Sequence, residues 1–430
     1  MLETGTPINM EHELKGIREL SIKYERLNTL INRVDAASLL MAHDKQSRKK
    51  AMGVDKVTKD QYAQNLIGNI KDLIGRMKRF EYVPQPVRRT YIPKANGKLR
   101  PLGIPSYEDR LVQAVMADIL KDIYEPRFLD CSYGFRENRS AHDVVRRIDR
   151  AVMREGVNYV LEADIKGFFD NLDQGWLMKF LAHDIADRNF LRYIKRFLKA
   201  GIMDGNERLE SDRGCPQGGL ISPVLANVYL HYVLDLWMER RVKKQLRGKM
   251  LYLRFADDFV CLFQYREDAI TVMQWLKARL EKFKLEVAEE KTRILPFGRY
   301  CGTKEKFDFL GFTFLNAETR EGRYRLAVIT SSKKLKAKRL AVKQWIRTRI
   351  NKPMVETWRL INLALRGHYN YYGVNGNMRA MTKFVWYVWH LTLKMLKRRS
   401  QNSKITVEKF SKLWDLFVAP PRITTCIWGR

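Results

Sequence analysis

The sequence predicts an α+β core over residues 51–325, followed by an all-helical and strongly basic region. Short apolar segments of strand length alternate with segments of helical periodicity in the first part of the chain, whereas the pattern beyond about residue 330 is helical throughout. The charge divides the chain in the same way, because 24 Lys and Arg stand against 4 Asp and Glu from Glu321 onward. We therefore expect a mixed core and a separate basic module.

The composition indicates a globular protein with a polyanionic partner. The chain has 430 residues, a hydrophobic content of 45% and a net charge of +32. So large a surplus favours nucleic acid as the partner, with an anionic membrane surface as the alternative. The longest apolar stretch, Phe384–Leu396, is too short to span a bilayer. No membrane partner is expected.

The five cysteines form no CxxC pair, and the N-terminal segment is acidic and polar, unlike a secretory signal peptide. These features predict a cytoplasmic location.

The first elements follow from local signals. Residues 1–50 are predicted to be a mostly helical extension. Strands are expected at Val87–Ile92 and Leu99–Ile104, because the segment between them contains a turn-forming Asn-Gly pair. Ser106 and Asp109 have the spacing of a capping box that opens a helix with one apolar face.

The central elements carry the acidic residues. A strand is expected over Asn158–Ile165, and a long helix starts at Ser222-Pro223, where proline is tolerated. Two apolar runs, Met250–Phe255 and Phe259–Phe263, are separated only by Ala-Asp-Asp. This pattern predicts a tight strand–turn–strand.

Three aspartates in these strands are candidates for a catalytic metal site. Asp257 and Asp258 lie side by side between apolar strands, and Asp164 ends a similar strand. Burying like charges is costly unless cations neutralise them. Hard oxygen donors suit Mg²⁺, with Mn²⁺ as a substitute, and two such ions catalyse phosphoryl transfer. The alternative is a polar hairpin turn without chemistry.

An ordered series of motifs resembles the reverse transcriptases encoded by group II introns. It extends from about Gly53 to about Gly373 and comprises Gly53–Asp55, Tyr91–Pro105, Ser132–His142, Asp164, Gly214–Pro223, Phe255–Asp258, Glu289–Thr292 and Phe309–Phe312. Lys56 stands where the family usually has glycine, and Phe255 where it has tyrosine. Each motif is weak alone, but the order and spacing of the set are specific.

The resemblance implies a right-hand polymerase and a particular division of the chain. Residues 51–325 would form fingers and palm, residues 326–400 a helical thumb or maturase domain, and residues 401–430 a short nucleic-acid-binding tail. The implied activity is RNA-directed DNA synthesis with two Mg²⁺ ions. The implied partners are group II intron RNA, a DNA primer or target, and deoxynucleoside triphosphates. No zinc-linked nuclease pattern follows the thumb motif, so no nuclease domain is expected.

The resemblance also implies roles for individual residues. Asp164, Asp257 and Asp258 would be catalytic and would bind the metal together with Ile165. The residues implied to bind the nucleotide are Lys94, Arg100, Phe168, as the gate against a 2′-hydroxyl, and Gln217. The residues expected to contact nucleic acid are Arg136, Lys333, Lys334, Lys338, Arg366 and Tyr369. For each, the alternative is a structural role in the core or on a solvated surface.

Three other functions stay open at the sequence level. A maturase without polymerase activity would bind RNA only, but it would have no need for three costly carboxylates. An RNA-synthesising polymerase would need room that a bulky Phe168 denies. A reverse transcriptase domesticated for defence or repair would differ only in its genomic setting.

Overall fold

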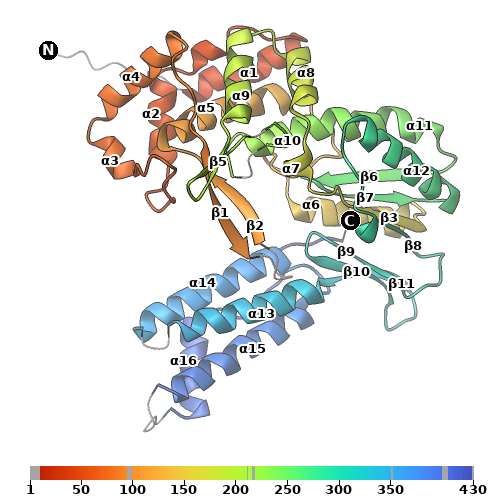
Figure 1. Ribbon diagram of the computed structural model, residues 1–430. Coiled ribbons are helices and arrows are strands. Elements are labelled where there is room, and N and C mark those ends of the chain that lie inside the picture. Colours follow the sequence, from red (N-terminus) through yellow and green to blue (C-terminus); the bar gives the residue numbers. More distant parts are fainter. Residues whose placement is uncertain are drawn as a thin grey trace.

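The computed structural model describes residues 10–93, 99–210, 212–215, 218–349, 352–399 and 405–428. Helices and a small sheet from the first part of the chain lie at one end of the molecule (Figure 1). A larger sheet lies beside them, and the last four helices form a bundle that projects from both. The expected mixed core and helical module are therefore present.

The first five helices form one packed group. Helix α5 is at its centre, and α1 and α2 pack against it. The first 50 residues thus belong to the main core, because Ile17 and Leu39 share one apolar cluster with Leu111. The helices of this group are α1 (Met10–Lys23), α2 (Ala36–Lys45), α3 (Lys59–Ala63), α4 (Leu66–Lys78) and α5 (Tyr107–Tyr124).

The start of α5 corrects the predicted capping box. Ser106 is the N-cap, but its hydroxyl donates to the Asp109 side chain at 2.6 Å and not to a backbone group. The free backbone N–H of Tyr107 is instead bound by the Asp55 carboxylate at 2.7 Å. A loop residue far away in the sequence therefore takes the capping role.

The fingers sheet has the strand order β2-β1-β4-β5. The predicted hairpin strands form β1 (Val87–Pro93) and β2 (Leu99–Ile104), which pair antiparallel. Strand β4 (Ile202–Asp204) adds to β1 in parallel and continues into β5 (Glu207–Leu209). Lys94, at the turn between β1 and β2, lies outside the described residues.

The palm sheet has the order β6-β7-β3-β8. Its strands are β3 (Tyr159–Ala163), β6 (Met250–Phe255), β7 (Asp258–Phe263) and β8 (Arg293–Pro296), in agreement with the predicted strands. Alternate residues face opposite sides. Leu161 and Cys261 join the large helical cluster, whereas Val160 and Leu262 join a second cluster. Both faces are therefore buried, as continuous apolar strands require.

Helices cover the palm sheet and connect it to the fingers. The predicted helix at Ser222 begins as α10 and continues through two π-helical segments, His231–Asp235 and Met238–Val242, into α11 (Lys243–Gln245). The other helices are α6 (Ala141–Arg154), α7 (Phe168–Asn171), α8 (Gln174–Asp184), α9 (Arg188–Lys199), α10 (Ser222–Leu230) and α12 (Arg266–Lys282).

A three-stranded antiparallel sheet leads from the palm to the thumb. Its strands are β9 (Lys306–Phe309), β10 (Phe312–Glu318) and β11 (Tyr324–Thr330), in the order β11-β10-β9. The thumb helices follow as α13 (Ser332–Arg347), α14 (Met354–Tyr372), α15 (Met378–Lys397) and α16 (Val407–Phe417). The first thumb helix thus begins within two residues of the last strand.

Helix α16 corrects the expectation of a separate C-terminal tail. Phe410 and Trp414 of this helix are buried in the thumb cluster, where Trp414 meets the ring of Trp358 at a centroid distance of 5.9 Å. Residues 405–428 are therefore part of the thumb and its support. The sequence pattern alone did not show this, because one amphipathic helix does not reveal its partner.

Candidate active site

Strand pairing brings the three predicted aspartates together. β6 and β7 are joined by a two-residue turn, in which Phe255 pairs with Asp258. β3 lies beside β7 with Ala163 opposite Phe259. Because Asp164 follows Ala163 and Asp258 precedes Phe259, the two aspartates leave neighbouring strands at the same edge of the sheet. The turn residue Ala256 has a φ of +58°.

The electrostatics of this edge indicate unmet negative charge. Removal of water, followed by repulsion from Asp257 and Asp164, raises the pKa of Asp258 to about 6, although its side chain faces an open cavity. Burial, followed by repulsion from Asp164, also raises the pKa of Asp257. A bound cation would relieve both effects.

Lysine side chains already neutralise part of this charge. The Lys291 ammonium forms an ion pair with Oδ2 of Asp164. Lys334, at the start of α13, is close enough to oppose the rise in the pKa of Asp258, although it counts for less than burial and the neighbouring carboxylates. Lys291 lies in the predicted Glu289–Thr292 motif, but the sequence gave no reason to assign it this contact.

The carboxylates fit divalent cations in chemistry and charge. Asp164 and Asp258 line one cavity of about 770 Å³, together with Lys291, Lys306 and Lys333. Among the described residues, however, no group of three or more His, Cys, Asp or Glu side chains forms a complete metal site. Mg²⁺ suits such an incomplete set, because it keeps waters and takes ligands from substrate phosphates. The Ile165 side chain is buried, so only its carbonyl oxygen is available for the predicted contact.

The fingers and palm enclose a second cavity of about 420 Å³. Tyr91 and Gly103 of the fingers line it, opposite Phe169, Asp170 and Gly214. Gly218 approaches the fingers so closely that a Cβ there would lie 2.3 Å from the Gly103 carbonyl oxygen. Two strands of the fingers and the segment after Asp164 therefore form one space beside the carboxylates.

The predicted nucleotide-binding residues have different outcomes. Arg100 is exposed on β2 and acts electrostatically on Asp257, whose pKa it lowers against the larger effect of burial. Gln217, like Lys94, lies outside the described residues. Phe168 is only 2% exposed and packs in the core against Tyr229.

The cavity position belongs to Phe169, which corrects the expectation for Phe168. The two rings are adjacent at 5.3 Å, but only Phe169 lines the cavity. Residues 168–171 form a short helix, α7, so consecutive side chains point in different directions. The sequence pattern Phe-Phe could not decide which ring faces inward.

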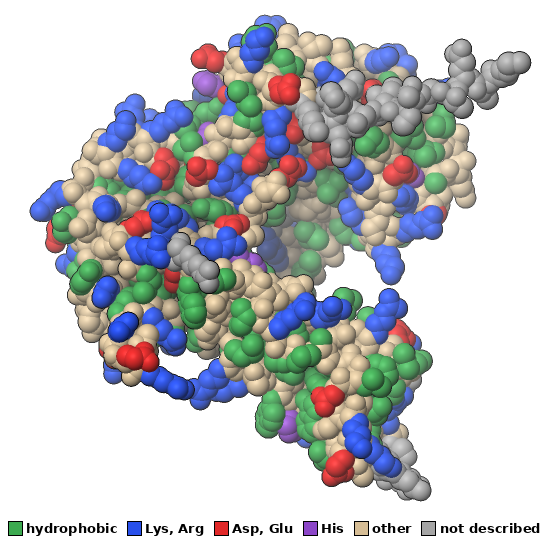
Figure 2. Space-filling view, turned by 180° about the vertical axis from the view of Figure 1, so that it is seen from behind, with side chains coloured by type: hydrophobic (Ala, Val, Ile, Leu, Met, Phe, Trp, Pro, Cys, Tyr) green, Lys and Arg blue, Asp and Glu red, His purple; other side chains and the backbone are tan. Residues whose placement is uncertain are grey.

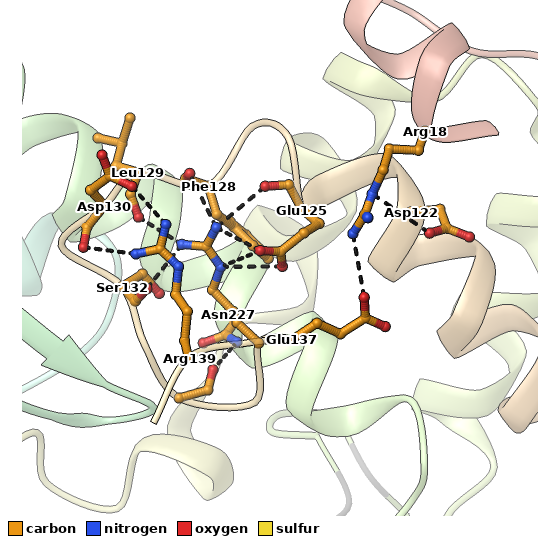
Figure 3. A network of polar contacts seen from close by, with 12 residues as sticks. Arg18, Asp122, Glu125, Phe128, Leu129, Asp130, Ser132, Glu137, Arg139 and Asn227 are labelled. Carbon is orange, nitrogen blue, oxygen red and sulfur yellow. Dashed lines mark hydrogen bonds and ion pairs between the residues drawn. The ribbon is translucent and has the colours of Figure 1, made fainter. Parts of the chain in front are cut away.

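Arg136 also has a structural position. Its side chain is 3% exposed and binds the Glu125 carboxylate at 2.8 Å and the carbonyl oxygens of Leu129 and Ser132 at 2.7 and 2.9 Å. Figure 3 shows Glu125, Leu129 and Ser132 converging around this loop, with Arg139 bound to Asp130 beside it. The Arg136 guanidinium is therefore used within the protein, which contradicts a direct contact with nucleic acid.

The thumb residues divide in the same way. Lys333, Lys334 and Arg366 are exposed, and Lys338 is half-buried with its Nζ 5.7 Å from the Phe384 ring centre. Figure 2 shows Lys and Arg side chains at the edges of the hollow between the thumb and the rest of the molecule. Tyr369 is only 1% exposed and donates to the Ala419 carbonyl at 3.2 Å, so it is a core residue and not a stacking surface.

The rest of the Arg366–Gly373 motif joins the thumb to the palm. The His142 Nε2 on α6 contacts the Tyr371 carbonyl oxygen at 2.7 Å, and the Tyr371 hydroxyl donates to the Leu310 carbonyl at 2.9 Å. The Phe312 ring stacks on Tyr371 at 5.6 Å. These aromatic residues position the thumb over the palm.

Fingers, a palm sheet with clustered carboxylates, and a helical thumb define a right-hand nucleic acid polymerase. The family model described as reverse transcriptase (RNA-dependent DNA polymerase) matches residues 92–314. The chain is 30% identical over 420 residues to the group II intron-encoded protein LtrA of Lactococcus lactis subsp. cremoris, covering 78% of this chain and 68% of that protein.

Two other relatives are similar. Protein YkfC of Escherichia coli K12 is 31% identical over 304 residues, which cover 64% of this chain and 78% of that protein. The nuclear intron maturase 2, mitochondrial, of Arabidopsis thaliana is 29% identical over 177 residues, 32% of this chain and 24% of that protein. The chain therefore belongs to the reverse transcriptase family, and within it to the group II intron-encoded reverse transcriptases and maturases.

None of the helices in the part of the chain that the structure describes has both the length and the apolar character of a bilayer span.

Proposed function

We propose that this protein is an active RNA-directed DNA polymerase that extends a DNA primer on group II intron RNA and assists splicing of that RNA. The observation that carries the polymerase proposal is the set of carboxylates at one sheet edge, two of which have raised pKa values. A protein that only bound RNA would have no use for this arrangement, since it stabilises nothing without a cation.

Residues of the chain have distinct roles in this proposal. Asp164, Asp257 and Asp258 hold the metal ions, with the Ile165 carbonyl as a further ligand. When bound, Mg²⁺ activates the primer 3′-hydroxyl and stabilises the leaving pyrophosphate. Arg100 and Lys94 bind the triphosphate, because a guanidinium forms paired hydrogen bonds with phosphate and an ammonium adds a point charge. Gln217 contacts the nucleotide or the template.

Phe169 selects the sugar of the incoming nucleotide. Its ring lines the cavity between fingers and palm, where a 2′-hydroxyl would need room. Lys333, Lys334, Lys338 and Arg366 bind the phosphates of the template–primer duplex. Their contribution is electrostatic and independent of sequence, so it depends on salt concentration.

The test separates the two proposed activities. Primer extension on an RNA template and splicing of the intron RNA are measured with wild type and with Asp257→Ala/Asp258→Ala. The proposal expects the double variant to lose DNA synthesis while it still binds the RNA and supports splicing. A folded wild type that binds RNA but makes no DNA would leave only the maturase function. Normal DNA synthesis by the double variant would refute the proposed site.

A further inference from the structure

The aspartate turn is attached to the protein by a completely buried arginine. Arg254 lies on β6, three residues before Asp257, and is 0% exposed. It forms an ion pair with Asp235, which is also 0% exposed and lies in the first π-helical segment. π-Helical turns are uncommon and occur often at functional sites.

Every N–H of the Arg254 guanidinium has an acceptor. Nε donates to Asp235 Oδ1 at 2.7 Å, and Nη2 donates to Asp235 Oδ2 at 2.5 Å and to the Ser132 hydroxyl at 2.8 Å. Nη1 donates to Asn227 Oδ1 at 2.8 Å and to the Ala256 carbonyl oxygen at 2.9 Å. A guanidinium has five N–H donors, so none is left over. An ammonium has three and could not make this set.

The bond to Ala256 acts on the turn itself. Ala256 is the first turn residue and has a positive φ, a conformation that alanine rarely adopts. The Ser132–Gly134 loop supports the turn from the other side, because a Cβ on Gly134 would lie 2.3 Å from the Ala256 nitrogen. Asn227 joins the two sides, since its amide nitrogen donates to the Gly134 carbonyl at 2.7 Å (Figure 3).

The ion pair gains little for stability alone. Two buried charges lose their hydration, and an apolar pair of similar volume often serves the fold as well or better. The contacts of Arg254 are instead specific, because they join a strand, a helix and a loop to one carbonyl of the turn.

We infer that Arg254, oriented by Asp235, is a positioning residue that fixes the turn between β6 and β7 and thereby the direction of Asp257 and Asp258. The inference rests on the proposed function for its catalytic consequence, but metal binding tests it without catalysis. Arg254 does not touch the substrate in this proposal. It acts through the Ala256 carbonyl.

The first experiment compares Arg254→Lys with the matched control Arg279→Lys. Arg279 also donates to carbonyl oxygens of the first π-helical segment, those of Tyr232 and Val233, but makes no recorded contact with the turn. Mn²⁺ binding to the protein without nucleotide is followed by electron paramagnetic resonance, and steady-state primer extension gives kcat and the nucleotide KM.

For Arg254→Lys we expect an at least tenfold weaker Mn²⁺ affinity and an at least tenfold lower kcat, with the nucleotide KM within twofold of wild type. Arg279→Lys should leave all three unchanged. If the wild type synthesises no DNA, the proposed function fails, and the Mn²⁺ measurement still decides the inference. Wild-type Mn²⁺ affinity in folded Arg254→Lys would overturn it.

A second variant covers the case in which Arg254→Lys does not fold. Arg254→Met/Asp235→Leu removes both charges and keeps the volume, so the core should remain intact. We expect a cooperative melt close to that of the wild type, together with the same loss of Mn²⁺ affinity. Normal Mn²⁺ binding, or failure of this variant to fold as well, would show that the pair serves the fold and not the turn.

Discussion

Asp258 shows how a single carboxylate can link stability to catalysis. Its pKa in the folded protein is raised to about 6, mainly by loss of water and then by its acidic neighbours. Because the folded state holds this proton more tightly than the unfolded state, stability is lost as pH rises from about 4 through 6. Above that range the ionised group opposes folding until a cation binds.

We therefore expect metal-free Asp258→Asn to be more stable than the wild type at pH 8, by about 1 kcal/mol once exposure to the cavity is allowed for. The difference should vanish below about pH 4, where the wild-type carboxyl is protonated. Thermal melts across pH measure it. Mg²⁺ should raise the melting temperature of the wild type more than that of the variant. Parallel pH curves for the two proteins would contradict this explanation.

The adjacent rings of Phe168 and Phe169 separate packing from selectivity. Phe169→Ala should fold and incorporate ribonucleotides at least tenfold more efficiently relative to deoxynucleotides, because it opens the cavity beside the sugar. Phe168→Ala should lose about 3–5 kcal/mol of stability, since it leaves a hole in the core. Single-nucleotide incorporation and denaturant unfolding measure the two effects. A gain of ribonucleotide use by Phe168→Ala with no such gain by Phe169→Ala would restore the original expectation.

At the scale of secondary-structure elements, loops determine which cations are available to a nucleic acid. The Ser132–His142 motif holds its arginine inside the loop, whereas α13 presents lysines at the edge of the palm cavity. The strands, the tight turn and the basic helix could all be predicted, because apolar runs and charge runs are local signals. The inward direction of Arg136 could not, since it depends on carbonyl oxygens that converge only after folding.

These two sets of cations should respond differently to mutation. Arg136→Met leaves Glu125 without its partner and should cost about 3–5 kcal/mol of stability. Lys333→Ala/Lys334→Ala should leave stability within about 0.5 kcal/mol but weaken binding to RNA–DNA duplex and reduce its salt dependence by about one to two phosphate contacts. Filter binding at several salt concentrations, with unfolding curves, distinguishes them. A normal salt slope for the lysine variant would remove α13 from the proposed duplex surface.

At the scale of the whole molecule, long-range packing decides where the parts lie. The division into a mixed core and a basic helical module follows from the sequence, but the attachment of the first 50 residues to α5 and of α16 to the thumb does not. Each depends on apolar faces that match partners more than 50 residues away. The approach of Asp164 to Asp258 is also long-range, yet it was predictable because both lie at the ends of apolar strands.

The packing of α16 predicts that the thumb needs the C-terminal residues. Trp414→Ala should destabilise the thumb by about 3 kcal/mol or more, because Trp414 is buried against Trp358. Hydrogen exchange should show faster exchange in α14 and α15 and little change in the palm strands. An exposed counterpart, Trp428→Ala, is the control, since Trp428 is 51% exposed. Equal protection of α14 in both variants would indicate that residues 405–428 act as an independent tail.

The central claim is that the carboxylates at the edge of the palm sheet make this chain a DNA polymerase. The most direct test is single-turnover extension of a DNA primer on an RNA template with Mg²⁺, comparing the wild type with Asp258→Asn at equal occupancy of the template–primer. We expect the wild type to add deoxynucleotides and the variant to be slower by at least a thousandfold, while both bind the duplex alike. Equal rates, or no extension by a wild type that binds the duplex, would contradict the claim.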